Sequence, residues 1–231
     1  MRKCALVLAS LLALGVTPTI ATAAPISSVT GGETTVLFGN GALETLGLEV
    51  TGIGGDAFIP GGLGPNSVGL PINSNTDPVN PTTFVYDGTS FIPFSGEFQH
   101  SGSVSLAGIT ETSVNVTVGD FTIAYDQSRA GDGRSGFYVA DNIDLQAILF
   151  DLAVPSFIEA FADNLQIGGD LLVSAEFDQI LLDTGLINES LAGFDAGAAL
   201  ISASSTVVPV PAAVWLFGSA LGLLGWVRRR T

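Results

Sequence analysis

Hydrophobic and polar residues alternate with a period of two through the middle of the chain, as is typical of half-buried β-strands. The clearest case places six apolar side chains on one face around a Gly119-Asp120 turn: Val114, Val116, Val118, Phe121, Ile123 and Tyr125. The same criteria predict further strands over 34–38, 45–50, 82–86, 99–107, 136–140, 147–154 and 198–207. Residues 157–163 are compatible with a strand or a helix.

Turn signals separate these segments, at Asp87-Gly88, Gly131-Asp132-Gly133 and Gly168-Gly169. Many short strands at such spacing predict an all-β fold, an antiparallel β-sandwich or jelly-roll-like body. One short helix is predicted from Ala175 to Asp183, with Ser174 as its N-cap and Gly185 just beyond its end.

Residues 39–81 have a different composition. Ten glycines fall between Gly39 and Gly69, and several Asn and Pro residues follow up to Pro81. This composition predicts long Gly/Pro/Asn-rich loops around one or two poorly packed strands.

The N-terminus has the layout of a secretory signal peptide. Arg2 and Lys3 precede an apolar run from Cys4 to Val16, and small residues follow. Ala21 and Ala23 precede the expected cut before Ala24, which makes residues 1–23 the signal peptide. An uncleaved membrane anchor is the alternative, but it needs a longer apolar run. Removal of Cys4 leaves residues 24–206, the predicted exported domain, without cysteine and therefore without disulfides or thiolate metal sites.

The C-terminus, residues 207–231, predicts a membrane segment. The 17 residues from Pro211 to Val227 carry no charge, and a helix of this length is about 25 Å long. Arg228, Arg229 and Arg230 follow at once and are expected to stay in the cytoplasm, with the body on the other side. The alternative is a buried core helix, which the arginine cluster disfavours.

The tail has a recognisable order of elements. It begins with a Pro-x-Pro element, continues with a Gly- and Leu-rich apolar stretch and ends with the arginine cluster. The motif consists of Val208, Pro209, Val210, Pro211, Ala212, Ala213 and Trp215. In this order the tail resembles the PEP-CTERM sorting signal, in the variant typified by VPLPA-CTERM tails. It departs from the namesake motif at Val210, where that motif has Glu.

The resemblance covers about a tenth of the chain and implies a destination rather than an activity. It implies a Gram-negative envelope protein that is an exosortase substrate, with cleavage near Pro209 to Pro211. The expected partners are the Sec translocon, signal peptidase, the exosortase, transiently the inner membrane, and the extracellular polysaccharide matrix. The inner-membrane intermediate has a periplasmic body and a cytoplasmic C-terminus, and the final site is the cell surface or extracellular matrix.

The charge of the body is strongly negative. All 22 acidic residues lie between the two terminal signals, against Arg129 and Arg134 only, which gives the body a net charge near −20. Such a surface disfavours nucleic acid and anionic lipid. It favours solubility in a hydrated matrix.

Catalytic signatures are weak in the body. His100 is the only histidine, it has polar neighbours, and a solvated side chain is expected rather than a Ser-His-Asp site. No Gly-x-Ser-x-Gly elbow occurs. The body has no tryptophan, the residue that often floors sugar-binding clefts.

One acidic loop is a candidate calcium site, and no other cofactor is expected. Asp126, Asp132, Asp141 and Asp144 surround a glycine-punctuated loop that supplies oxygen ligands. A plain acidic connection is the alternative, with Arg129 and Arg134 forming local ion pairs.

The sequence as a whole therefore predicts a non-enzymatic surface or matrix protein that an exosortase sorts. One alternative is an envelope-anchored hydrolase or carbohydrate-binding module acting on extracellular polymer. Another is a permanently anchored membrane protein.

Overall fold

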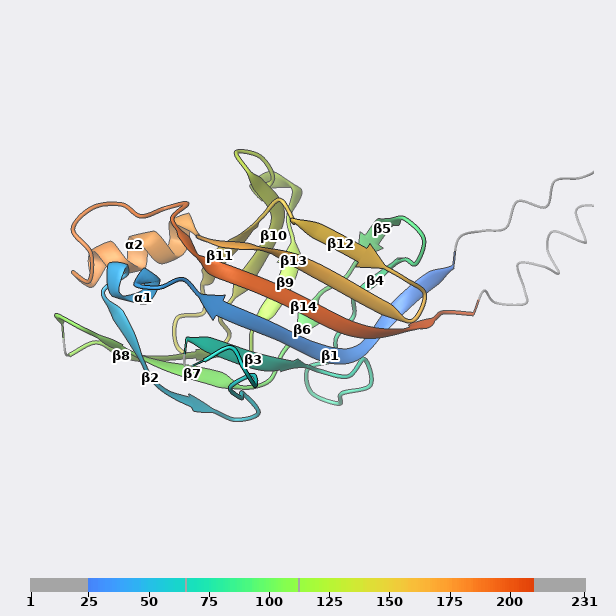
Figure 1. The fold of residues 1–231 in the computed structure, drawn as a ribbon, viewed down its shortest axis with the longest axis horizontal. Helices are drawn as coiled ribbons and strands as arrows, with labels where there is room; N and C mark the ends of the chain where they lie inside the picture. The colour runs from blue at the N-terminus through green and yellow to red at the C-terminus, as the bar shows by residue number, and fades with distance from the viewer. Residues whose placement is uncertain (1–24, 65, 112, 210–231) are drawn as a thin grey trace, which may run out of the picture.

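The structure is a computed structural model that describes residues 25–64, 66–111 and 113–209. Within these ranges the chain is mostly antiparallel β-structure (Figure 1). The strands are β1 Ile26–Phe38, β2 Leu48–Gly54, β3 Ser67–Ile72, β4 Val85–Asp87, β5 Phe91–Ser95, β6 Phe98–Gln99, β7 Ser103–Gly108, β8 Asn115–Gly119, β9 Thr122–Tyr125, β10 Arg134–Ala140, β11 Ile148–Ala153, β12 Phe157–Ala160, β13 Asn164–Val173 and β14 Asp195–Val207. The helical segments are α1 Ala42–Thr45, the 3₁₀ turn η1 Gln127–Arg129 and α2 Ala175–Asp183.

The strands form one long curled sheet and one small sheet. The long sheet has the order β5-β4-β1-β14-β13-β11-β10-β9-β6, with β3 also paired to β1 and β12 to β13. The small sheet has the order β2-β7-β8 and lies beneath the long one in Figure 1. The expected antiparallel β class is confirmed, as a sandwich-like arrangement in which one sheet is much larger than the other.

The pair β1 and β14 runs along the whole long sheet. Each strand has 13 residues, and the register extends from Ser27 opposite Val207 to Phe38 opposite Gly197. In β14 the side chains of Ala199, Ile201 and Ala203 face the core, while the residues between them are more exposed, as a period of two requires.

An aromatic cluster closes the curl of the sheet. Phe94 of β5 packs edge-on to Tyr125 of β9, with ring centroids 5.0 Å apart, and stacks on Phe137 of β10 at 5.3 Å. Phe84 stacks on Phe98 at 4.1 Å. These contacts join elements from opposite ends of the strand order, so the curled sheet encloses a common core.

The predicted helix 175–183 is confirmed, together with its cap. The Ser174 hydroxyl oxygen accepts a hydrogen bond from the backbone N–H of Phe177. Among the described residues, no helix is both long and apolar enough to cross a bilayer. The predicted signal peptide and the segment 211–227 lie outside the described residues.

The expectation for residues 39–81 needs correction, because strand β3 in this region is well packed. Val68, Leu70 and Ile72 of β3 are buried, and β3 pairs with β1. The strand is hard to predict because it contains Gly69 and Pro71, two residue types that are uncommon inside strands. A Cβ at Gly69 would lie only 2.4 Å from the ring of Phe58, so the glycine leaves room for that ring.

The turn expected at Gly168-Gly169 is also wrong, because both glycines lie inside β13. A Cβ at Gly168 would lie 2.4 Å from the ring of Phe157 on β12. The glycine therefore marks a place where an aromatic ring lies flat against the sheet, not a change of chain direction.

Gly32 provides a test of how tightly β1 and β14 pack. A Cβ at Gly32 would lie 2.3 Å from the carbonyl oxygen of Ser202, and its φ of +137° is strained for other residues. We expect Gly32→Ala to lower the free energy of unfolding by about 3 kcal/mol, measured by urea denaturation. The matched control is Gly31→Ala, because that site has a similar φ of +151° but its nearest atom is 3.7 Å away. Equal losses in the two variants would contradict this account.

Candidate functional site

The four candidate calcium ligands have different partners, and among the described residues no three of them form a group that could hold a metal ion. Asp126 caps the turn η1 by accepting a hydrogen bond from the Ser128 N–H at 2.8 Å. Asp132 is exposed and lies 4.0 Å from Arg134. Asp144 accepts a hydrogen bond from the Thr117 N–H at 2.7 Å. Asp126 and Asp132 thus have partners within residues 126–134, whereas Asp144 binds the backbone of β8.

Asp141 is buried and acts as an anchor for the backbone. Its Oδ1 accepts hydrogen bonds from Gly119 N–H at 2.6 Å and Ile143 N–H at 3.2 Å. Its Oδ2 accepts from Leu145 N–H at 2.8 Å and Gln146 N–H at 3.1 Å. Across residues 25–64, 66–111 and 113–209, no three His, Cys, Asp or Glu side chains lie close enough together to hold a metal ion.

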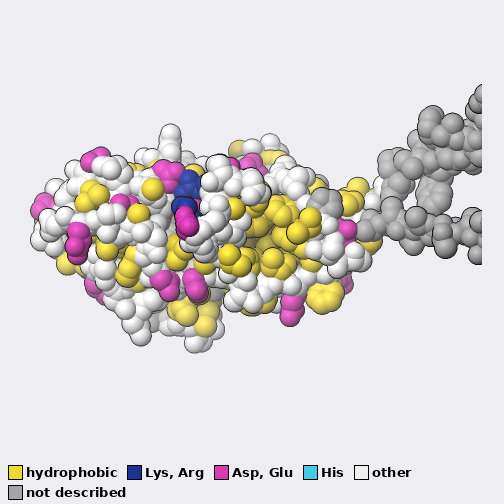
Figure 2. Space-filling model, turned by 90° about the horizontal axis from the view of Figure 1, so that it is seen from above, with side chains coloured by type: hydrophobic (Ala, Val, Ile, Leu, Met, Phe, Trp, Pro, Cys, Tyr) yellow, Lys and Arg dark blue, Asp and Glu magenta, His cyan; other side chains and the backbone are white. Residues whose placement is uncertain are grey.

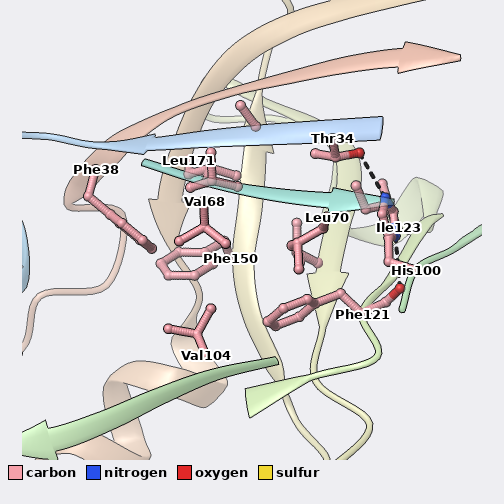
Figure 3. A pocket seen from close by; sticks show the side chains of 13 residues that line it. Thr34, Phe38, Val68, Leu70, His100, Val104, Phe121, Ile123, Phe150 and Leu171 are labelled. Atoms are coloured by element: carbon pink, nitrogen blue, oxygen red, sulfur yellow. Dashed lines mark hydrogen bonds between the residues drawn. The ribbon is translucent and has the colours of Figure 1, made fainter. Parts of the chain in front are cut away.

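His100 was expected to be solvated, and this expectation is wrong. The side chain is 1% exposed and lies inside the sandwich (Figure 3). One ring nitrogen, Nε2, lies 2.7 Å from the Thr34 hydroxyl, and Nδ1 lies 2.9 Å from the Phe121 carbonyl oxygen. Because a carbonyl oxygen can only accept, Nδ1 carries the proton and Nε2 accepts from Thr34. Burial lowers the pKa of His100 from 6.5 to about 4, so the ring is neutral at pH 7.

The low pKa of His100 makes stability depend on pH. Below pH 6.5 the unfolded chain binds a proton at this ring, while the folded protein does not until the pH approaches 4. Stability therefore falls as the pH drops through this interval, by about 2 kcal/mol at pH 5. Urea denaturation at pH 7 and pH 5 measures the loss. The variant His100→Gln lacks the titrating ring and should lose clearly less between the same two pH values; an identical loss would refute this assignment.

The interior cavity beside His100 is too small and too apolar for a ligand. Its volume is about 50 Å³. Figure 3 shows it lined by apolar side chains such as Phe38, Phe121 and Phe150, with Thr34 and His100 at one side. Cavities lined in this way stay dry unless polar groups inside them lack partners. Both His100 nitrogens already have protein partners.

The two arginines of the body form ion pairs across several elements. Arg129 binds Asp151 of β11 through two hydrogen bonds of 2.7 and 3.1 Å. It also binds Glu176 of α2 through two bonds of 2.6 and 3.0 Å. These bonds raise the pKa of Arg129, first through Glu176 and then through Asp151, and the Arg129 bond lowers the pKa of Glu176.

Arg134 lies on the other side of Asp151, at 3.7 Å. Figure 2 shows Lys and Arg side chains in a single patch on the face drawn, beside acidic side chains. The strongest ion pairs are thus not local to the acidic loop. They fasten η1 and α2 to the long sheet, so the network around the buried Asp151 has a structural role.

A surface groove is the better candidate for a binding site. It has a volume of about 550 Å³ and lies where β1 and β13 end and β14 begins. We call it the distal groove. Its lining residues are Leu37, Phe38, Gly39, Asn40, Leu63, Asn66, Asp170, Asp195, Gly197 and Ala198.

A second hollow of about 270 Å³ adjoins the distal groove. The two share Leu37, Leu63, Asp170 and Ala198, and the second extends over Leu200 to Phe157. From Asp195 to Leu200 the strand β14 covers about 17 Å. The combined surface is thus an elongated depression across the outer face of the sheet.

The groove combines apolar side chains with hydrogen-bonding groups. Leu63 is 46% exposed and Leu37 is 39% exposed, so both offer apolar surface to a ligand. Asn40 and Asn66 carry amides, and Asp170 and Asp195 carry carboxylates. The charged groups of the groove are acidic only, which disfavours anionic ligands.

The predicted tail and signal residues are mostly outside the described residues. Val208 and Pro209 are described and follow β14 directly. The remaining residues of these predictions are Ala21, Ala23, Ala24, Val210, Pro211, Ala212, Ala213, Trp215, Arg228, Arg229 and Arg230, which lie outside.

Comparisons with known proteins give a likeness in structure but none in sequence. No family model and no curated protein matches this chain. A search of solved structures finds similarity to the C-terminal domain of HtaA from Corynebacterium glutamicum. The TM-score is 0.48 and the sequence identity 14%, over 78% of this chain and 99% of that domain.

Proposed function

We propose that this chain is an exported protein of the cell surface or extracellular matrix, which an exosortase sorts through residues 207–231, and that its body is non-enzymatic. The observation that carries the proposal is the position of the two chain ends. Val208 donates its N–H to the Ile26 carbonyl oxygen at 2.7 Å, so the described chain begins and finishes side by side (Figure 1). After removal of the signal peptide, a membrane segment attached at this end would hold the body there and leave its other end free.

The place of the expected cut also supports sorting. Strand β14 ends at Val207, and Pro209 follows after one residue. Proline has no backbone N–H and cannot continue the ladder. Cleavage between Pro209 and Pro211 therefore removes no paired residue of the sheet, and the body keeps its core when the tail is lost.

The sorting proposal predicts a truncated mature protein. In a host that encodes the exosortase, mass spectrometry of the surface or matrix form should find a C-terminus near Pro209 to Pro211. The tryptic peptides around Arg228 to Arg230 should be absent from that fraction. Deleting the exosortase gene should leave the full tail on a membrane-bound form. An intact Arg-Arg-Arg-Thr terminus on the surface form of the wild-type host would instead favour a permanently anchored protein.

The distal groove favours a second function, binding of a neutral extracellular polysaccharide. The distal groove and the hollow next to it form an elongated depression on the surface of the body. The depression offers both apolar side chains and groups that can hydrogen-bond to hydroxyls. A polymer chain held there links the protein to its matrix without catalysis. The alternative hydrolase uses the same surface, with Asp170 and Asp195 as the available carboxylates.

Binding in the groove is testable with two variants. Leu63→Ser and Asp170→Asn should each weaken binding of the neutral fraction of the host's exopolymer, about tenfold for the lost leucine surface, as measured by affinity electrophoresis. Ile53→Ser is the matched control, because Ile53 is also exposed but lies on β2 of the small sheet. Unchanged binding in both groove variants would exclude this site. Release of reducing ends that Asp170→Asn abolishes would favour the hydrolase.

A further inference from the structure

Exposed apolar side chains surround the end of the body where the chain begins and finishes. Ile92 is 67% exposed and Phe161 is 53% exposed. Ile26, Val207 and Val208 are each more than a third exposed. We call these five residues the terminal face. Figure 2 shows hydrophobic side chains gathered on the half of the drawn face that adjoins this end.

Hydrogen bonds and strand register hold the terminal face together. Ser27 pairs with Val207, and the Ser27 hydroxyl donates to the Ala162 carbonyl oxygen at 2.9 Å, next to Phe161. The Gly88 N–H donates to the Pro25 carbonyl oxygen at 3.0 Å. This bond places the β4–β5 turn, which leads to Ile92, beside the start of β1.

We propose that the terminal face rests in the headgroup region of a zwitterionic lipid membrane. The proposal rests on the proposed function, which places residues 211–227 in that membrane. Only Val208, Pro209 and Val210 separate β14 from Pro211. Four fully extended steps from Val207 to Pro211 span at most about 14 Å. The terminal face therefore lies close to the headgroup layer, which is roughly 5 to 8 Å thick on each side of the hydrocarbon.

The charges near the terminal face set the kind of lipid. Asp163 is exposed two residues after Phe161, and Asp87 is the last residue of β4, directly before the β4–β5 turn. The Asp87 carboxylate accepts hydrogen bonds from the Thr89 hydroxyl and the Thr89 N–H, so protein groups partly satisfy it. The body has no lysine, and both of its arginines lie in the Asp151 network, so no described side chain at this end is a cation. The single α-amino group that the cut before Ala24 leaves here is outnumbered by Asp87 and Asp163, which disfavours anionic headgroups. Apolar contact with zwitterionic lipid is the interaction that remains.

The test uses the chain from Ala24 to Thr231 in phosphatidylcholine vesicles. This form lacks Cys4, so Phe161→Cys supplies a single site for an environment-sensitive fluorophore. The label should shift its emission to the blue on reconstitution and be quenched by headgroup-labelled lipid. The control is Leu63→Cys, which has similar exposure but lies at the distal groove; its label should show neither effect.

Tryptophan emission tests insertion of the tail independently of the contact between the terminal face and the headgroups. Trp215 and Trp226 are the only tryptophans of the chain, so bromolipid quenching of their emission reports insertion of the tail. Quenched tryptophans with a water-exposed label at position 161 would overturn the terminal-face proposal and leave the membrane segment intact. Unquenched tryptophans would overturn both. Equal responses of the labels at positions 161 and 63 would also overturn it, because the contact would then not be confined to this end.

Discussion

The pairing of β1 with β14 is the constraint on which the rest of the structure depends. It joins residues about 170 positions apart, and each partner uses its second edge to build the rest of the long sheet. On β1 that edge pairs with β3 and β4, and on β14 it pairs with β13. Because the ladder runs from Ser27 to Phe38, it also brings the two ends of the body together. A pairing of such long sequence separation requires a large loss of chain entropy before it is stabilised by the core.

The charged residues of the body are distributed unevenly, because acids are spread along the chain and the two arginines lie together. The body has 22 acidic residues, and its two arginines are placed around one buried carboxylate, Asp151. Burying this carboxylate without partners would be costly, and two guanidinium groups compensate for it. The network fixes η1 and α2 to β11. Because both arginines take part in it, the other charged side chains of the body are all acidic. Copies of the body therefore repel one another, which opposes their association.

The sequence predicts those features that depend on near neighbours. The period-two alternation indicates the antiparallel class, and Ser174 marks the start of α2, because the capping bond spans only three residues. The sequence does not predict features that depend on partners far apart along the chain. The Thr34 partner of His100 is 66 positions away, so polar residues next to His100 in the sequence do not show whether its side chain is buried.

Glycines mislead for the same reason. Gly69 and Gly168 leave room for the rings of Phe58 and Phe157, a requirement that only the folded sheet reveals. Likewise, the spacing of the acidic residues cannot show that Asp126, Asp141 and Asp144 bind backbone N–H groups while Asp132 pairs with Arg134.

The distal groove and the terminal face lie at opposite ends of the same two strands. Asp195 and Val207 are the first and last residues of β14, and about 40 Å of extended strand separates them. A body held at the terminal face thus presents the groove far from the attachment point, beyond the headgroup layer. The same β1–β14 ladder that brings the chain ends together also sets this distance, since shortening the pair would move the groove towards the membrane. In the proposed sorting, a cut between Pro209 and Pro211 would free the terminal face from its tether without touching the groove, because the groove lies at the other end of β14.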